Sequence, residues 1–208
     1  MAVLIEQPEL IECIDRINHI RVSVEEFRTN DIVTINFNDN LKIKCIVVDI
    51  IDGIATFISL NTVFDMPLSF DGSKCKSWLE SDLREYLNLN FYDNCYPFMQ
   101  DKLVKDDNLD YFSIPSEKEI FGINKYGEDE DDRSWPIMKY RRRYRMGLDN
   151  DENLNWYWLR TKRKNSSAYF CRCNDFGDAS YSNSSRSGGV RLRFFMPQNE
   201  DQQSTIFR

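Results

Sequence analysis

Cys171 and Cys173 are the closest pair of thiols in the sequence. On a β-strand, residues two positions apart point to the same side, so both thiols could contact one copper ion or one substrate. Such a site needs further ligands, and neither a histidine nor another cysteine lies nearby in the sequence. We therefore expect both cysteines to be reduced core residues, and we predict no metal and no cofactor.

Other catalytic patterns have little support. The single histidine, His19, lies near the amino end, which disfavours a Ser–His–Asp triad. Gly188 and Gly189 are not followed by Lys and Ser or Thr, as a phosphate-binding loop requires. Residues 129–132 are acidic but lack the spaced ligands and the glycine of a calcium loop. The sequence therefore predicts no catalytic residues and a protein that is not an enzyme.

A binding surface is the prediction that the residues favour. Residues 156–196 place a Ser- and Asn-rich middle between two apolar, strand-like blocks, as in many recognition surfaces. Strand alternation divides this middle into two sets. The odd-numbered set is more apolar and is expected to face inward: Tyr169, Cys171, Cys173, Gly177, Ala179 and Tyr181. The even-numbered set is expected to face solvent or ligand: Phe170, Arg172, Asn174, Phe176, Asp178, Ser180, Ser182 and Ser184.

Charge is distributed unevenly along the chain. The net charge of −7 and the pI near 4.9 disfavour nucleic acid as a partner. An acidic run at 128–132, expected to be a solvated loop, precedes a basic run at 139–145 that contains Tyr140 and Tyr144. The basic run could hold phosphate or an acidic glycan, but we favour the alternative that its arginines pair with the acidic run. The predicted ligand-binding residues are Arg142, Tyr144, Arg172, Asn174, Phe176, Asp178, Tyr181, Asn183 and Arg186.

The elements that position these residues form an α+β pattern. Alternating apolar residues over 32–60, with turn signals at Asp39-Asn40 and Asp52-Gly53, predict an antiparallel β meander of three strands. Apolar spacing over 76–104 predicts helices capped by Ser77 or Ser81. Their core-facing stripe is expected to contain Trp78, Leu79, Leu83, Tyr86, Leu87 and Phe91.

The second half of the chain continues this mixture. Ser116 and Glu119 have the spacing of a capping box, and residues 123–150 are expected to form a long loop. Strands are expected at 154–159, with Trp156 and Trp158 on one face, and at 190–196.

The chain divides into three predicted parts. Helix-like apolar spacing in residues 1–30 predicts an N-terminal helical arm or docking segment, followed by a domain at 31–197 and a polar tail at 198–208. The first residues lack the pattern of a signal peptide, and the longest apolar run, at 45–51, is too short to span a membrane. We therefore expect cytoplasmic synthesis without a signal peptide and no membrane insertion.

Four blocks, in their order, resemble a known family. They are the end of the meander at 57–70, WLESDLREYLNLNF at 78–91, YFSIPSEKEIFG at 111–122, and WYWLRT at 156–161 with GGVRLRFFM at 188–196. Together they resemble a bacterial and phage domain family of unassigned function, whose C-terminal half is similar to the C-type-lectin-like fold of formylglycine-generating-enzyme-like domains. The resemblance spans about 32–196. Thr161 and Leu192 depart from it, because the family usually has Ser and Pro there.

The resemblance implies a C-type-lectin-like α+β domain made in a bacterial cytoplasm and placed in a virion, on a phage or prophage tail or capsid. In some members, diversity-generating retroelements vary the surface where residues 172–184 lie. We expect a non-enzymatic module that recognises a protein or glycan ligand and docks on other subunits through its N-terminal arm. The alternatives are a structural virion component that self-assembles through the same surface, and a formylglycine-oxidase-like enzyme.

Overall fold

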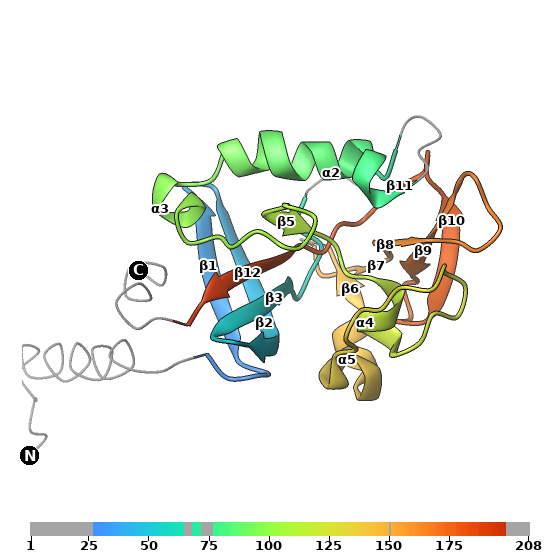
Figure 1. Ribbon diagram of the computed structural model, residues 1–208, viewed down its shortest axis with the longest axis horizontal. Coiled ribbons are helices and arrows are strands. Elements are labelled where there is room, and N and C mark those ends of the chain that lie inside the picture. Colours follow the sequence, from blue (N-terminus) through green and yellow to red (C-terminus); the bar gives the residue numbers. More distant parts are fainter. Residues whose placement is uncertain (1–26, 65–67, 72–76, 150, 199–208) are drawn as a thin grey trace, which may run out of the picture.

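A five-stranded antiparallel sheet occupies one side of the computed structural model, which describes residues 27–64, 68–71, 77–149 and 151–198 (Figure 1). Strands β1 (Ile32–Asn38), β2 (Leu41–Ile51) and β3 (Ile54–Ser59) form the predicted meander. Asp52 and Gly53 join β2 to β3 with φ angles of 50° and 74°, the positive values that a tight hairpin turn requires. The meander and this turn are confirmed.

The last described strand closes the same sheet. Strand β12 (Arg193–Pro197) pairs with β3 on one side and with β5 (Phe112–Ser113) on the other, giving the order β1-β2-β3-β12-β5. It begins later than the predicted start at residue 190. The reason is that Val190 and Leu192 bond to Val63 and Ser59 through single backbone contacts before regular pairing starts. The chain end thereby enters the centre of the sheet formed by its beginning.

A run of short helices lies along the top of this sheet in Figure 1. It consists of η1 (Trp78–Glu80), α2 (Asp82–Tyr86), η2 (Leu87–Phe91) and then α3 (Pro97–Gln100). Ser81 caps α2 by accepting the Arg84 backbone N–H, whereas Ser77 makes no side-chain cap. The predicted stripe is buried in part: its inward members are Trp78, Leu83, Leu87 and Phe91, and its exposed members are Leu79 and Tyr86.

The region predicted as a long loop contains regular structure, so that expectation was wrong. Helix α4 (Glu117–Phe121) begins at the predicted capping box, and α5 (Pro136–Tyr140) and α6 (Arg142–Arg145) follow. Strand β6 (Gly147–Leu148) then pairs with β7 (Leu154–Asn155). Helices this short show no apolar period, and tertiary bonds such as Trp135 N–H to Glu119 O, 3.0 Å, hold them.

A second sheet carries most of the predicted binding residues. Strands β8 (Tyr157–Lys162), β9 (Tyr169–Cys173) and β10 (Ala179–Asn183) form an antiparallel sheet in the order β10-β9-β8. Strand β11 (Ser187–Gly188) then pairs with β4 (Leu68–Ser69). In Figure 1, β10 lies at the side of the molecule opposite β1 and β12. The chain enters and leaves the described body near those strands, because the Gln198 side chain donates to the Phe27 carbonyl at 2.6 Å.

Core packing covers both faces of the second sheet. Phe170 stacks on Phe70 with ring centroids 3.9 Å apart, whereas Cys171 and Cys173 belong to a separate cluster with Trp135 on the other face. The predicted division into inward odd and outward even residues is therefore wrong in part. The even-numbered residues that are buried are Phe170, Ser182 and Ser184, and odd-numbered Tyr169 is 37% exposed.

The molecule is thus a mixed α+β protein with antiparallel sheets and few, short helices. None of the helices in the described ranges is long and apolar enough to cross a membrane. The predicted arm, with His19 and Cys13, lies outside the described residues except for its last four positions, and Cys75 and most of the predicted tail also lie outside them.

Candidate recognition surface

The predicted binding residues fall into three groups in space. The first group surrounds the turn between β9 and β10. Arg142 donates from Nε to the Phe176 carbonyl at 2.6 Å and from Nη2 to Asp178 Oδ2 at 2.8 Å. Asn174 Oδ1 accepts the backbone N–H groups of Phe176 and Asp178, so its side chain shapes the turn. Phe176 projects from this turn with 61% of its surface exposed.

The basic run does not pair with the acidic run, contrary to the prediction that we favoured. Arg142 reaches Asp178, and Arg145 donates to the carbonyls of Gly177, Met138 and Lys139. Tyr144 accepts a bond from Arg143 at its hydroxyl and one from Arg191 at its carbonyl. The helices α5 and α6 direct the arginines toward the β9–β10 turn, so the pairing expected from closeness in sequence does not form.

The second group lies on the odd-numbered face of β10, the edge strand of the second sheet. The Arg163 guanidinium lies 3.8 Å from the ring centroid of Tyr181 and 5.7 Å from that of Tyr169. Tyr126 contacts Tyr181 from the other side, with ring centroids 5.3 Å apart. We refer to Tyr126, Arg163, Tyr169 and Tyr181 as the tyrosine surface. Asn183, on the same strand, bonds to Ser185 and forms the next turn.

The third group lies on the opposite face of the sheet. Arg172 and Ser180 are directly paired, whereas Tyr181 pairs with Cys171, and neighbouring residues of a strand point to opposite faces. Arg172 lies over the Trp156 ring, and Arg186 is exposed in the turn after β10. The structure therefore brings Arg142 to the β9–β10 turn, whereas Tyr144 contacts Arg143 and Arg191. It separates Tyr181 from Arg172 and Arg186.

Sequence reasoning missed most of the tyrosine surface. Tyr169 was assigned to the core, and neither Arg163 nor Tyr126 was considered. The sequence signal was alternation within each strand, and the register that pairs Tyr181 with Cys171 then puts Tyr169 and Tyr181 on one face. No sequence signal placed Tyr126 there, because its position depends on a loop from another part of the chain.

Backbone contacts hold that loop in place. Glu117, buried at the start of α4, accepts the backbone N–H groups of Tyr126 and Gly127. Lys164 N–H donates to the Tyr126 carbonyl at 3.0 Å. Gly127 has no room for a side chain, since a Cβ atom there would lie 2.2 Å from Thr161 Cγ2. Tyr126 therefore joins the tyrosine surface from a loop whose backbone is fixed before any ligand binds.

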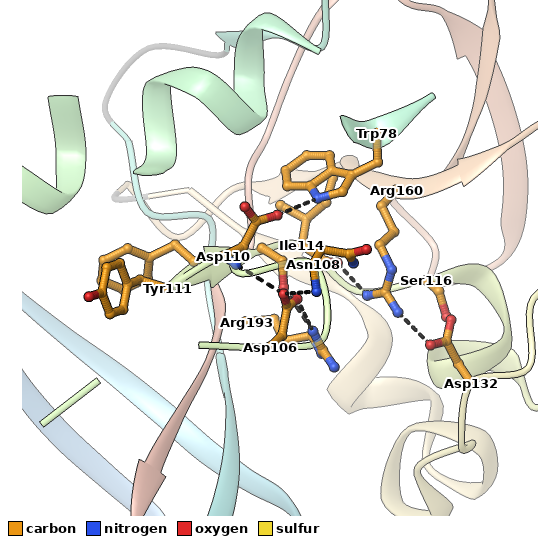
Figure 2. A network of polar contacts seen from close by, with 12 residues as sticks. Trp78, Asp106, Asn108, Asp110, Tyr111, Ile114, Ser116, Asp132, Arg160 and Arg193 are labelled. Carbon is orange, nitrogen blue, oxygen red and sulfur yellow. Dashed lines mark hydrogen bonds and ion pairs between the residues drawn. The ribbon is translucent and has the colours of Figure 1, made fainter. Parts of the chain in front are cut away.

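A network of charged side chains joins β8, β12 and α4 (Figure 2). Arg160 donates to the Ile114 carbonyl and to Glu119 at 2.9 Å each, and to Asp132 at 2.7 Å. Arg193 contacts Asp106 at 3.3 Å and Glu119 at 3.0 Å. Beside the network lies a cleft of about 480 Å³, whose lining includes Asp106, Glu119, Asp132 and Arg193. These carboxylates already form ion pairs with arginines, so we assign the network a structural role.

The acidic run takes part in this network and is not simply a solvated loop. Burial raises the pKa of Glu130 to about 7, although the Thr161 hydroxyl and Arg160 oppose the shift. Burial also acts to raise the pKa of Asp132, but Arg160, the Ser116 hydroxyl and Arg193 together outweigh it, so the pKa is lowered overall. Thr161 Oγ1 donates to Glu130 at 2.6 Å and accepts the Glu117 N–H at 2.8 Å. Residues 128–132 are therefore tied to β8 and α4.

The cysteine pair lies in an environment that disfavours thiolate chemistry. Cys171 and Cys173 are buried and reduced, as are Cys45 and Cys95, which confirms the expected core role for these four. Burial raises the pKa of Cys173 to about 11 and that of Cys171 further. Within the described ranges, no group of three or more His, Cys, Asp or Glu side chains is arranged to hold a metal ion.

Comparison of the chain with protein-family models, with curated protein sequences and with solved structures gave no match.

Proposed function

We propose that this protein is a non-enzymatic recognition module with a C-type-lectin-like fold, carried on a phage or prophage particle. The observation that supports it best is the tyrosine surface, in which Arg163 is stacked on Tyr181 at the exposed edge of the second sheet. The ligand would be a protein or a glycan.

Residue type and electrostatics both support recognition at this surface. Tyrosine and arginine contribute most of the binding energy at many interfaces, and tyrosine does so with little loss of conformational entropy. The Arg163 side chain makes no hydrogen bond or ion pair with any residue that the structure describes; its contacts are with the rings of Tyr169 and Tyr181. Its N–H donors are therefore available to a ligand, and the rings already hold the guanidinium in one orientation.

The position of the surface suits a module that is attached at one end. Phe27 and Gln198 lie beside the first sheet, and β10 lies on the opposite side of the molecule (Figure 1). A particle that holds the domain through the arm would leave the tyrosine surface facing outward. Many copies on one particle would then convert weak single contacts into strong attachment.

The proposal is tested with the fluorescently labelled full chain on an array of bacterial surface polysaccharides and on a panel of bacterial cells counted by flow cytometry. We expect binding to a subset, and a loss of about thirtyfold in affinity for Arg163→Ala and for Tyr181→Ala. Lys139 and Tyr140 form a matched control, because Lys139 lies 5.3 Å from the ring of the exposed Tyr140 outside this surface. Lys139→Ala and Tyr140→Ala should leave binding unchanged; equal losses in both pairs would refute the assignment.

The edge position of β10 favours a second candidate, a structural component that joins copies of itself through this strand. An edge strand offers unpaired backbone groups to another strand. This candidate predicts concentration-dependent self-association in analytical ultracentrifugation, weakened by Ala179→Pro, because the ladder leaves the Ala179 N–H facing away from β9. It also predicts no binding to cells or polysaccharides.

A further inference from the structure

A chemically different site lies around Arg172, in the middle of β9. Arg172 is paired with Trp158 of β8 and with Ser180 of β10, so its side chain leaves the sheet on the face away from Tyr181. There its guanidinium lies over the Trp156 ring, 4.6 Å from the ring centroid. The Trp156 ring is held in turn by Trp158, whose ring centroid is 4.9 Å away.

The Arg172 side chain has no polar partner among the described residues. Neither a hydrogen bond nor an ion pair reaches it from the residues that the structure describes. Its Nε atom is enclosed without an acceptor, whereas its Nη atoms are not enclosed in this way. An enclosed donor without an acceptor normally destabilises a protein, and most proteins avoid it. The open Nη atoms are the part of the group that a ligand can reach.

A second positive charge lies close to this one. Arg186 is in the turn after β10, where its N–H donates to the Asn183 carbonyl at 3.0 Å. Two positions further, Gly188 packs against Trp156, with 2.2 Å between Trp156 Cη2 and the place of a Cβ atom. Burial lowers the pKa of Arg172; the Asp175 carboxylate opposes this shift, and the charge of Arg186 adds to it. Asp175 reduces the positive charge here but makes no ion pair with Arg172 among the described contacts.

Other arginines of this chain do have carboxylate partners. The sequence holds 34 acidic against 27 basic residues. Arginine ion pairs elsewhere in the described ranges are Arg84 with Asp110, Arg133 with Asp49, Arg142 with Asp178, Arg160 with Glu119, and Arg193 with Asp106. Arg172 is more enclosed than Arg133 and Arg142, yet it has no such partner among the described residues, which leaves its open Nη atoms to a ligand.

The geometry points to an oxyanion-binding site formed by Arg172, Arg186 and Trp156, which we call the Arg172 site. A carboxylate or a phosphate group of a ligand would accept from the Nη atoms of Arg172, whose plane the Trp156 ring holds. Arg186 would supply the second charge. The site faces away from the tyrosine surface, so it goes beyond the function proposed above and can fail independently of it.

The test uses the ¹⁵N-labelled full chain and follows the indole N–H signal of Trp156. The other three tryptophans, Trp78, Trp135 and Trp158, are at most 5% exposed, and Trp156→Phe assigns the remaining signal. Phosphate and glucuronate are titrated separately, with sodium chloride at equal ionic strength and glucose as controls. We expect a saturable shift with phosphate, glucuronate or both, at a dissociation constant on the order of a millimolar, and no saturable shift with either control. The tighter of the two identifies the oxyanion.

Variants distinguish binding at the Arg172 site from nonspecific attraction of an anion to the charge of the protein. Arg172→Gln should abolish saturation, and Arg186→Gln should weaken binding about fivefold by removing one neighbouring charge. Arg163→Gln makes the same change on the opposite face and should leave the titration unaltered. Arg172→Gln removes a charge that has no ion-pair partner among the described residues, so its melting temperature should change little. A saturable shift that persists in Arg172→Gln, or a wild-type response equal to that in chloride, would overturn the proposal.

Discussion

The guanidinium of Arg160 lies 2.9 Å from the carboxylate of Glu119, and both side chains are almost fully enclosed, with 9% and 4% of their surfaces exposed. Glu119 also meets Arg193 and completes the capping box of α4. One carboxylate therefore links β8, β12 and α4, which come from distant parts of the chain.

Replacing Glu119 by Gln should lower the free energy of unfolding by about 3 kcal/mol, because two enclosed arginines lose a carboxylate. Glutamine can still complete a capping box, so the change isolates the charge. Urea unfolding provides the measurement. Glu128→Gln, at an exposed position in the acidic run, should shift the same quantity by less than about 0.5 kcal/mol. Similar values for the two variants would contradict a central role for Glu119.

The pKa of Glu130 predicts how stability depends on pH. In the folded protein this pKa is raised from 4.5 to about 7, so between those values the folded state retains a proton that the unfolded state has lost. Stability from this group is therefore complete below about pH 4.5 and falls as pH rises to about 7.

Glu130→Gln should remove that pH dependence. The difference in melting temperature between variant and wild type should be small at pH 4.5 and should increasingly favour the variant up to pH 8. The lowered pKa of Asp132 places its own titration below this pH range. A difference that stays constant with pH would mean that Glu130 titrates normally.

Two glycines should respond differently to a methyl group. At Gly188 a Cβ atom would lie 2.2 Å from Trp156 Cη2, whereas at Gly53, with φ of 74°, it would meet nothing within 4 Å. Gly188→Ala should therefore destabilise the protein by at least about 2 kcal/mol through steric overlap and should move the Trp156 indole signal. Gly53→Ala should cost about 1 kcal/mol through backbone strain alone and leave that signal in place. A larger loss of stability for Gly53→Ala than for Gly188→Ala would show that the Trp156 ring can move aside.

The buried thiols should react only after unfolding. Burial raises the pKa of Cys173 to about 11 and that of Cys95 to about 12, so their thiolate forms are scarce at neutral pH. In a variant with Cys13→Ser and Cys75→Ser, we expect the remaining four cysteines to react with a disulfide reagent at the rate of global unfolding. Fast reaction of Cys171 and Cys173 in the native state, or its suppression by copper, would instead favour an oxidase-like activity.

Much of the fold was predictable where local chemistry decides it. The Asp52-Gly53 turn requires positive φ angles, and the Ser116 and Glu119 capping box satisfies the first N–H groups of a helix through residues three positions apart. The meander of the first three strands follows from alternation between such turns. The short helices in 123–150 were not predictable, because each has too few residues for a period and depends on distant contacts.

The candidate site was predictable only in part. Alternation gives each strand two faces, but the register that pairs Tyr181 with Cys171 puts Tyr169 and Tyr181 on the same one. Alternation also cannot indicate what covers that face. Phe170 is buried because Phe70, a hundred residues earlier, stacks on it. Tyr169, assigned to the core, is exposed because it is the first residue of β9, and the cluster that covers this face includes Cys171 and Cys173 but not Tyr169.

The sequence alone determined the residue types at the edge of the second sheet, the local turns and the alternation of faces, since these depend on neighbours in the chain. Only the tertiary structure decided which charges meet. Arg142 pairs with Asp178, 36 residues away, instead of the nearby acidic run, whereas Arg163 and Arg172 contact aromatic rings and have no ion-pair partner among the described residues. The physical reason is that an ion pair needs its atoms within about 4 Å, and the path of the folded chain sets that distance.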